Sequence, residues 1–283
     1  MTARVTILCS VLLAVALAVP AAVQAEAEES NFSGVFQVDV TNAYFFRGIL
    51  QEREGVQIQP WLELYYSLYS SDDGFLRNVT VGGGTWLSFQ SERTLATQDP
   101  QWLYEADYYP IVSLGFAGGV SLTTIYYFYT SPNGAYSTVQ ELNHKLAWDD
   151  SEALGAWSMA PWVNLAVETE NTSFGSKSGV GLQAGIGPTL YAAENESFTL
   201  KLPVEAGFSI DDYYESSDGG NNGFGYASAG LLASIPLSFV PEGAGAWSVN
   251  LGAKYFVFNE ILDSANRGRG TYPVGTASLA VAF

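Results

Sequence analysis

The chain has 283 residues, of which 48% are hydrophobic, 14% aromatic and only 14% charged, whereas a typical soluble domain carries about 25% charged residues. Acidic residues outnumber basic ones 29 to 11, which gives a formal net charge of -18, and the chain has one His and one Cys. This composition excludes a disulfide scaffold, a zinc site built from Cys and His, and a basic surface that follows nucleic-acid phosphates.

Residues 1–25 are predicted to be a secretory signal peptide. Arg4 supplies a positive start, residues 5–19 form an apolar run, and residues 23–25 offer small side chains at a cleavage site. The apolar run is too short for a membrane anchor. We expect cleavage to leave residues 26–283 as one domain outside the cytoplasm, because no linker or change of composition divides them.

The rest of the chain alternates between apolar and polar residues, which is typical of strands with two different faces. Most alternating segments run ten to fifteen residues, whereas strands of soluble proteins usually have about five or six and tilted membrane strands about nine to eleven. The sequence therefore predicts an all-β fold, a transmembrane antiparallel up-and-down β-barrel of about 12 strands. The predicted strands lie at 33–47, 56–69, 77–90, 101–115, 119–130, 136–148, 157–169, 180–192, 197–210, 224–239, 246–259 and 272–283.

Aromatic residues at strand ends support a membrane-spanning barrel. Trp102, Tyr104 and Tyr108 are expected to share the lipid-facing side of one strand, and Trp157 and Trp247 to begin two others. Such positions match the aromatic girdles of a membrane protein. The predicted connections alternate between shorter turns and longer loops, as in barrels with short periplasmic turns. The longer set lies at 48–55, 91–100, 131–135, 170–179, 211–223 and 260–271.

The last predicted strand ends in an aromatic residue. Leu279, Val281 and Phe283 share one face of this alternating segment. A terminal Phe on such a strand resembles the signature that the assembly machinery of bacterial outer membranes reads. We therefore expect two partners for the chain, the lipid bilayer of an outer membrane and that machinery, and no nucleic acid.

The same alternation assigns side chains to the lumen. More acidic than basic side chains are assigned to this inner wall, and a net acidic wall favours cations or neutral polar solutes. The alternative is that the charges pair with one another and fill the interior, as in the smallest barrels. The acidic candidates are Asp39, Glu63, Glu105, Asp107, Glu141, Glu168 and Glu205, and the basic candidates are Arg47, Lys145, Lys201 and Lys254.

One predicted loop is rich in carboxylates. Residues 211–223 contain Asp211, Asp212, Glu215 and Asp218 between glycines and asparagines. Oxygen ligands of this kind suit Ca²⁺, and a solvated acidic loop is the competing interpretation. We assign no metal and no cofactor to the chain from its sequence.

The single His does not indicate an enzyme. His144 is followed by Lys145 and Leu146, so the pattern of the outer-membrane phospholipases, a His with a Ser two residues later, is absent. Alternation places His144 on the lipid side between two leucines, where we interpret it as an interfacial residue and not as a general base. We therefore predict no catalytic residues and no enzymatic activity.

The segment from Asn42 to Gln51 carries a family resemblance. Tyr44, Phe46, Arg47, Gly48 and Ile49, with Gln51, match an aromatic-x-x-Arg-Gly-Ile-x-Gln pattern. In this segment, in its size and in its terminal Phe, the chain resembles the TorF-type porin family of Gram-negative bacteria. The resemblance implies an outer-membrane β-barrel with channel activity and supplies no substrate. From the residues alone, Arg47 is expected to pair with a wall carboxylate or to act as a gating charge.

Three functions follow from these observations. We expect a porin for passive diffusion of small polar solutes, neutral or cationic. The alternative is a non-conducting structural or adhesive barrel whose outer loops bind a partner. A secreted β-sandwich is the third hypothesis, and closed strand pairing would exclude it.

Overall fold

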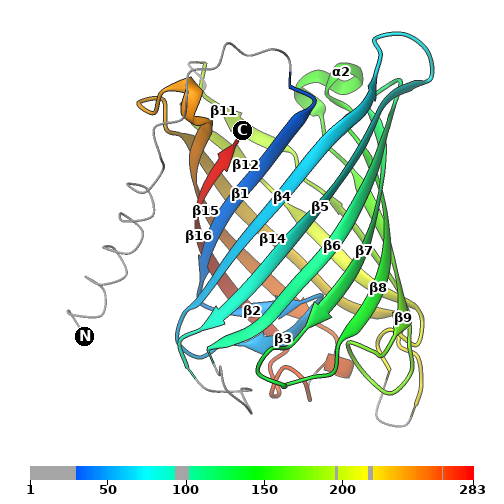
Figure 1. Ribbon diagram of the computed structural model, residues 1–283. Coiled ribbons are helices and arrows are strands. Elements are labelled where there is room, and N and C mark those ends of the chain that lie inside the picture. Colours follow the sequence, from blue (N-terminus) through cyan, green and yellow to red (C-terminus); the bar gives the residue numbers. More distant parts are fainter. Residues whose placement is uncertain (1–29, 93–101, 195–196, 216–218, 263) are drawn as a thin grey trace, which may run out of the picture.

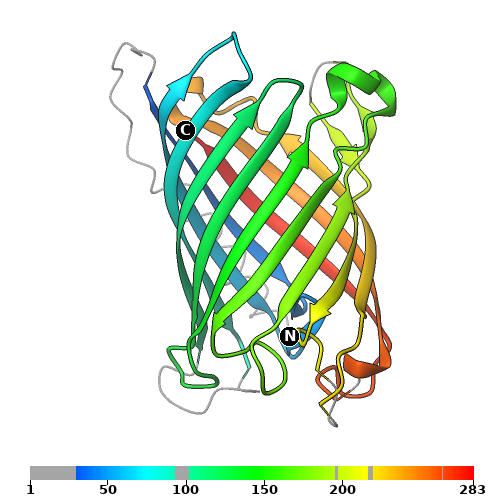
Figure 2. The same cartoon turned by 90° about the vertical axis from the view of Figure 1, so that its right-hand side faces the viewer.

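The computed structural model describes residues 30–92, 102–194, 197–215, 219–262 and 264–283. These residues form a closed, tilted antiparallel barrel (Figures 1 and 2). The strands are β1 (Phe32–Thr41), β2 (Tyr44–Phe46), β3 (Ile49–Glu52), β4 (Gln57–Ser70), β5 (Leu76–Gln90), β6 (Leu103–Phe116), β7 (Val120–Thr130), β8 (Val139–Trp148), β9 (Trp162–Glu170), β10 (Val180–Ile186), β11 (Thr189–Ala192), β12 (Thr199–Lys201), β13 (Val204–Asp211), β14 (Phe224–Pro236), β15 (Ala246–Phe258) and β16 (Thr271–Ala282).

The ring closes because β1 pairs with both β4 and β16, while β14 pairs with β15. Two wall strands are interrupted at prolines, so β10 with β11 and β12 with β13 each count as one, and the barrel has 12 strands. Leu202 N donates to Pro188 O at 3.0 Å and Gly230 N to Pro203 O at 3.0 Å, so the register continues past both prolines. Closure removes the sheet edges that lipid would not tolerate, which confirms the predicted fold and excludes the β-sandwich.

The short helical elements lie in the connections between wall strands. They are α2 (Ser151–Leu154) and three 3₁₀ turns, η1 (Gly155–Trp157), η2 (Glu242–Ala244) and η3 (Glu260–Leu262). Among the described residues, no helix has the length and hydropathy needed to cross a bilayer. Trp157 lies in η1 with 81% of its surface exposed, so the prediction that it begins a strand is wrong. Pro161 and the left-handed Ala160 (φ +46°) delay the start of β9 to Trp162.

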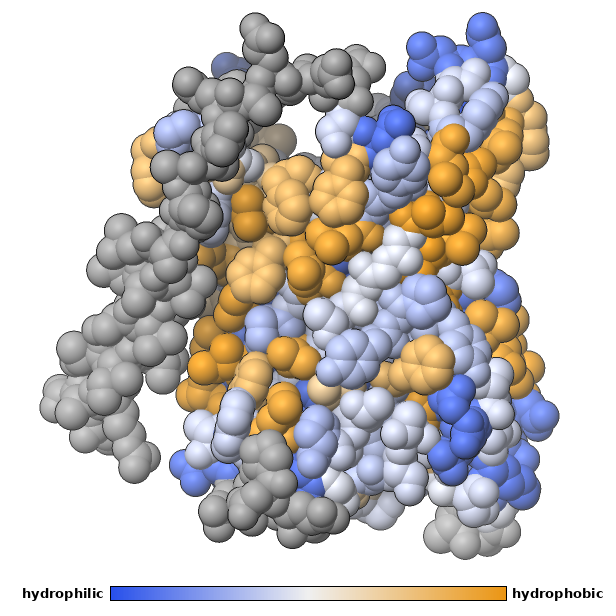
Figure 3. All heavy atoms as spheres, in the orientation of Figure 1, coloured by the Kyte–Doolittle hydropathy of each residue, from blue (hydrophilic) through white to orange (hydrophobic). Residues whose placement is uncertain are grey.

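The two ends of the barrel differ. At the terminal end, β1 begins and β16 ends, and Phe283 and Gly34 exchange backbone hydrogen bonds of 2.7 and 3.0 Å. The opposite end, called the loop end here, carries the longer connections. Hydrophobic residues cover much of the outer wall, and the most hydrophilic ones lie toward the two ends (Figure 3). Leu251, Tyr255 and Val257, on one face of β15, are about half exposed, as lipid-facing residues should be.

One aromatic residue departs from the predicted alternation. The register between β5 and β6 shifts, so that Ser88 pairs with Glu105 and Phe89 with Leu103. Tyr104 is the extra residue of this bulge and turns inward, where it is buried and donates a 2.6 Å hydrogen bond to Gln51. The prediction that Tyr104 faces lipid is therefore wrong, because a β-bulge changes which face a side chain occupies.

Candidate functional site

The first loop folds into the barrel instead of extending from it. The first strand was predicted to run to residue 47, but β1 ends at Thr41, whose hydroxyl donates to Ala43 O and Gly275 O at 3.0 and 3.1 Å. The chain then turns inward and forms the β2–β3 hairpin at the loop end (Figure 1). Ala43, Ile49 and Leu50 are buried, so this hairpin is packed against the barrel and not solvated.

Two residues with positive φ make the hairpin turn. Arg47 has φ +46° and Gly48 has φ +82°, the combination of a tight two-residue turn between antiparallel strands. An added Cβ on Gly48 would lie 2.8 Å from Tyr226 on the wall. The turn therefore requires glycine twice over, for its backbone and for its close approach to β14.

Arg47, at the hairpin tip, reaches across the lumen to β8. Its two terminal nitrogens donate to the two carboxylate oxygens of Glu141, each at 2.5 Å, and one of them also donates to Asn143 Oδ1 at 2.9 Å. Strands β4–β7 separate β1 from β8 in the ring, so this pair ties opposite walls together. The Arg47 and Glu141 side chains are 9% and 0% exposed, which makes the pair a buried, bidentate one. We call Arg47, Glu141, Asn143 and Tyr213 the latch.

Aromatic stacking holds the two sides of the hairpin. Phe45 stacks on Phe256 and Phe258 of β15, with ring centroids 5.3 and 5.0 Å apart. Phe46 meets Tyr129 of β7 edge to face at 5.1 Å. The hairpin thus contacts opposite walls through apolar rings as well as through its charge.

A second loop covers the hairpin tip. Ser209 Oγ accepts the backbone N–H groups of Tyr213 and Tyr214 at 2.9 and 3.3 Å, which bends the chain inward after β13. The Tyr213 hydroxyl donates to Glu141 at 3.0 Å, and the Tyr214 hydroxyl donates to the backbone oxygen of Arg47 at 2.9 Å. Both tyrosines are almost fully buried.

A third loop locks the other side of the turn. Asn266 Nδ2 donates to Gly48 O and its Oδ1 accepts from Leu50 N, both at 2.9 Å. Leu262, in η3 of the same loop, is fully buried in the hydrophobic cluster with Ile49. The second and third loops therefore converge on the hairpin, which belongs to the first loop, and we call this assembly of three loops the plug.

Electrostatics favour the charged form of the latch. Burial alone would lower the pKa of Arg47, but the charge of Glu141 raises it well above the ordinary value. Burial raises the pKa of Tyr213 well above its usual range, so this hydroxyl keeps its proton as a hydrogen-bond donor. Arg47 therefore stays a cation in the latch, and Tyr213 stays a hydrogen-bond donor.

The remaining lumen candidates have different partners along the barrel wall and in the loops. Tyr109 donates to Glu63 at 3.0 Å, and Ser173 N and Gly179 N donate to Glu168 at 2.6 and 2.8 Å. Glu105 and Asp107 are buried on β6 beside the hairpin side of the wall. The Lys145 ammonium group lies 5.1 Å from the ring centre of Trp162, and that of Lys254 lies 3.3 Å from a carboxylate oxygen of Glu205. Lys201 pairs in register with Leu232. Asp39 lines the cavity described next.

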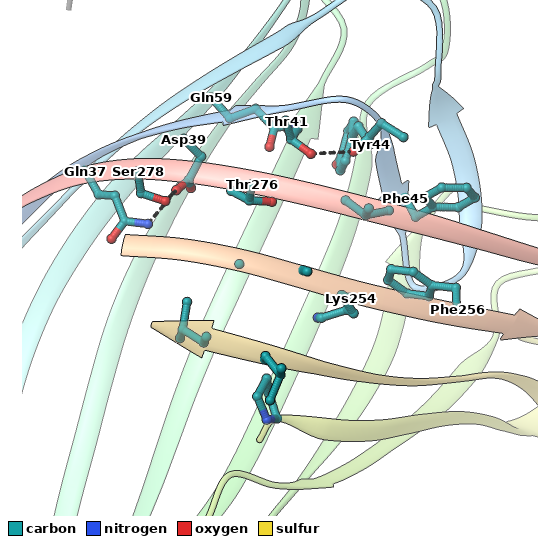
Figure 4. Close-up of a pocket in the computed structure, with 17 residues that line it drawn as sticks. Gln37, Asp39, Thr41, Tyr44, Phe45, Gln59, Lys254, Phe256, Thr276 and Ser278 are labelled. Carbon is teal, nitrogen blue, oxygen red and sulfur yellow. Dashed lines mark hydrogen bonds between the residues drawn. The ribbon is translucent and has the colours of Figure 1, made fainter. Parts of the chain in front are cut away.

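A cavity of about 440 Å³ lies inside the barrel against the hairpin (Figure 4). Its walls come from β1, β4 and β14–β16, and Tyr44 and Phe45 of the hairpin close one side. Polar and apolar side chains both face it. The polar lining residues are Gln37, Asp39, Thr41, Tyr44, Gln59, Lys254, Thr276 and Ser278.

The structure contains no metal-binding cluster among its described residues. Glu215, which was considered as a Ca²⁺ ligand, accepts hydrogen bonds from Ser176 N at 2.6 Å and from the Ser176 hydroxyl. Lys177 Nζ lies 3.2 Å from Asp212 and 3.6 Å from Glu215. These contacts link two loops, whereas Asp218 lies outside the described residues.

Several residues of the plug were not recognised from the sequence. Asn143, Tyr213, Tyr214 and Asn266 carry no motif, and their partners are far away in the chain. Only the Arg47–Gly48 pair carries a signal in the sequence, because a glycine directly after the arginine allows the chain to turn. His144 lies on β8, where Thr124 Oγ1 is 3.0 Å from its Nδ1.

Known proteins show only a distant similarity to this chain. No family model matches the chain, and no curated protein matches it. The NanC porin is 12% identical, with a TM-score of 0.41, over 88% of this chain and 98% of that one. The translocator domain of the autotransporter NalP from Neisseria meningitidis is 12% identical (TM-score 0.39; 100% and 96% covered), and outer membrane phospholipase A from Escherichia coli is 13% identical (TM-score 0.42; 88% and 92% covered).

Proposed function

We propose that this protein is an outer-membrane channel for passive diffusion of small polar solutes, neutral or cationic, and that the plug restricts its outer mouth. The observation that best supports this proposal is the cavity of about 440 Å³, lined in part by polar side chains, inside a closed barrel whose outer wall is apolar. A pore through a bilayer needs this arrangement, since lipid contacts the outside and water the inside.

The membrane orientation follows from the same proposal. With an exported chain, the terminal end faces the periplasm and the loop end the exterior, because outer-membrane barrels have short periplasmic turns. The predicted signal peptide at 1–25 lies outside the described residues. Phe283, paired with Gly34 at the rim, is where we expect the assembly machinery to bind. The TorF-type porin resemblance of residues 42–51 agrees with this proposal, and those residues form the hairpin.

The plug favours a second candidate, a barrel that does not conduct and whose outer loops bind a partner. The latch and the stacked rings of Phe45 and Phe256 cross the lumen with buried contacts. A solute can pass the latch and the stacked rings only if the hairpin moves, or through a narrow path beside them. We therefore expect low conductance from the intact protein.

Planar bilayers separate the two candidates. The intact barrel should give small, discrete, cation-preferring current steps. A variant with residues 43–54 replaced by a short glycine linker should give larger steps, because Thr41 and Gln57 are already paired in register and the barrel can close without the hairpin. A large conductance in the intact barrel would contradict the plug, and silence of both proteins would leave the partner-binding barrel.

A further inference from the structure

The cavity beneath the hairpin has two chemically different walls. One wall is polar, with Gln37, Asp39 and Ser278 on neighbouring strands β1 and β16 (Figure 4). The other is apolar, with Leu232 of β14 and Val274 of β16, which pair in register with the lumen-facing Gly252 and Lys254. Its volume, about 440 Å³, lies within the range of small-molecule sites.

The two charged residues of the lining differ in how they are neutralised. Lys254 lies 3.3 Å from Glu205, and its ammonium group sits 5.5 Å from the ring centre of Phe256. Asp39 forms no ion pair with any residue that the structure describes. The cavity therefore presents one carboxylate whose negative charge is not balanced by any cation of the described residues.

The Asp39 carboxylate is held in one orientation. Gln37 Nε2 donates to its Oδ1 at 2.6 Å and Ser278 Oγ donates to the same oxygen at 2.5 Å (Figure 4). Within the described part of the chain no hydrogen bond reaches the other oxygen, Oδ2. A carboxylate fixed through one oxygen keeps its second oxygen available as a charge-assisted acceptor for a ligand.

From this geometry we propose that Asp39 is the ammonium-binding group of a solute site in the lumen, and that the solute is a small polyhydroxylated amine. The ammonium group binds Oδ2, the hydroxyl groups bond the glutamines and hydroxyl side chains of the polar wall, and the C–H face packs on Leu232 and Val274. The inference rests on the proposed channel function and names the solute class for it. An amino sugar in its ammonium form has this surface.

The test compares two sugars of equal size by equilibrium dialysis against the purified mature barrel in detergent. Glucosamine and glucose are the probes, at about pH 6, where the amine is protonated. Wild-type protein should bind glucosamine about tenfold more tightly than glucose, the effect of one charge-assisted contact. In Asp39→Asn, which keeps an acceptor for Gln37 and Ser278, that preference should disappear.

Two further variants sharpen the result. Asp72→Asn removes the same charge from an exposed terminal-end turn and should keep the full preference. Ser278→Ala leaves the charge but removes an orienting donor, so its preference should fall part of the way. Heat-dependent gel mobility shows whether each barrel has folded.

Binding is measured without ion flow, so this proposal and the channel fail separately. Equal affinity of the wild type for both sugars, or an undiminished preference in Asp39→Asn, overturns the Asp39 site even if the barrel conducts. A silent bilayer with a preference that depends on Asp39 overturns the channel and keeps the site.

Discussion

The guanidinium group of Arg47 and the carboxylate of Glu141 form a two-fold hydrogen-bonded ion pair, both contacts 2.5 Å long, across the inside of the barrel. The two residues are 94 positions apart, with Arg47 at the tip of the hairpin in the lumen and Glu141 on the wall strand β8. Because Tyr129, Tyr213 and Asn143 also donate to Glu141, this carboxylate has four protein partners and no exposed surface. Glu141 is therefore the anchor on which the plug depends.

Replacing that anchor should loosen the plug. Glu141→Gln leaves the Arg47 charge buried without a counter-charge, which costs about 3–5 kcal/mol for a buried pair. We expect larger or more frequent current steps in planar bilayers and a lower urea midpoint of unfolding. Glu205→Gln is the control, since its pair with Lys254 is partly exposed and should be worth about 1 kcal/mol or less. Equal effects of the two variants would show that the latch does not hold the hairpin.

The hairpin turn should depend on glycine for two separable reasons. Gly48→Ala forces a left-handed backbone on alanine and places its Cβ 2.8 Å from Tyr226. Gly74→Ala has the same backbone problem (φ +85°), but no atom lies within 4 Å of the added Cβ. Backbone strain alone costs about 1–2 kcal/mol, so Gly48→Ala should destabilise the barrel by more than Gly74→Ala in urea unfolding. A difference of zero would argue against close packing of the hairpin on β14.

The tie between loops at Glu215 should weaken in acid. Hydrogen bonds from the Ser176 backbone N–H, and then from its hydroxyl, lower the pKa of Glu215 below its ordinary value. Because the folded pKa is the lower one, the contribution of Glu215 to stability is fully present above about pH 4.3, the ordinary Glu value, and is lost as the pH falls through the folded pKa.

The amide resonance of Ser176 reports this titration in detergent micelles. We expect its chemical shift to move with a midpoint below the ordinary Glu pKa, and to stop moving in Glu215→Gln. A midpoint above that value would mean that Ser176 does not bond the carboxylate in solution.

A charged substitution should cost much more stability at an outward-facing position of β15 than at the neighbouring inward-facing one. Leu251 is 50% exposed on the outer wall, whereas Asn250 pairs in register with Ser278, a residue of the lumen cavity. Leu251→Arg should cost about 2–4 kcal/mol if the position lies near the bilayer midplane, and Asn250→Arg much less. Urea-induced unfolding from lipid vesicles measures both, and a larger cost at Asn250 would reverse our assignment of inside and outside.

Alternation predicted the barrel well because each wall strand has a lipid side and a lumen side, so the pattern is a local consequence of a two-faced environment. The segment 56–69 corresponds to β4 (Gln57–Ser70) and 246–259 to β15 (Ala246–Phe258). The pattern failed where local geometry changed the faces, at the bulge that turns Tyr104 inward and at residues 157–161, where the end of η1 and Pro161 delay the start of β9.

The sequence by itself determined the closed antiparallel barrel, the number of its strands and most of the residues that face outward, because period-two alternation is a property of adjacent residues. Only the tertiary structure decided that the first loop enters the lumen, that Arg47 bonds Glu141, and that Asp39 forms no ion pair with any described residue. Those contacts join residues far apart in the chain across the ring, and they exist only once strand tilt and closure have brought opposite walls within reach of a side chain.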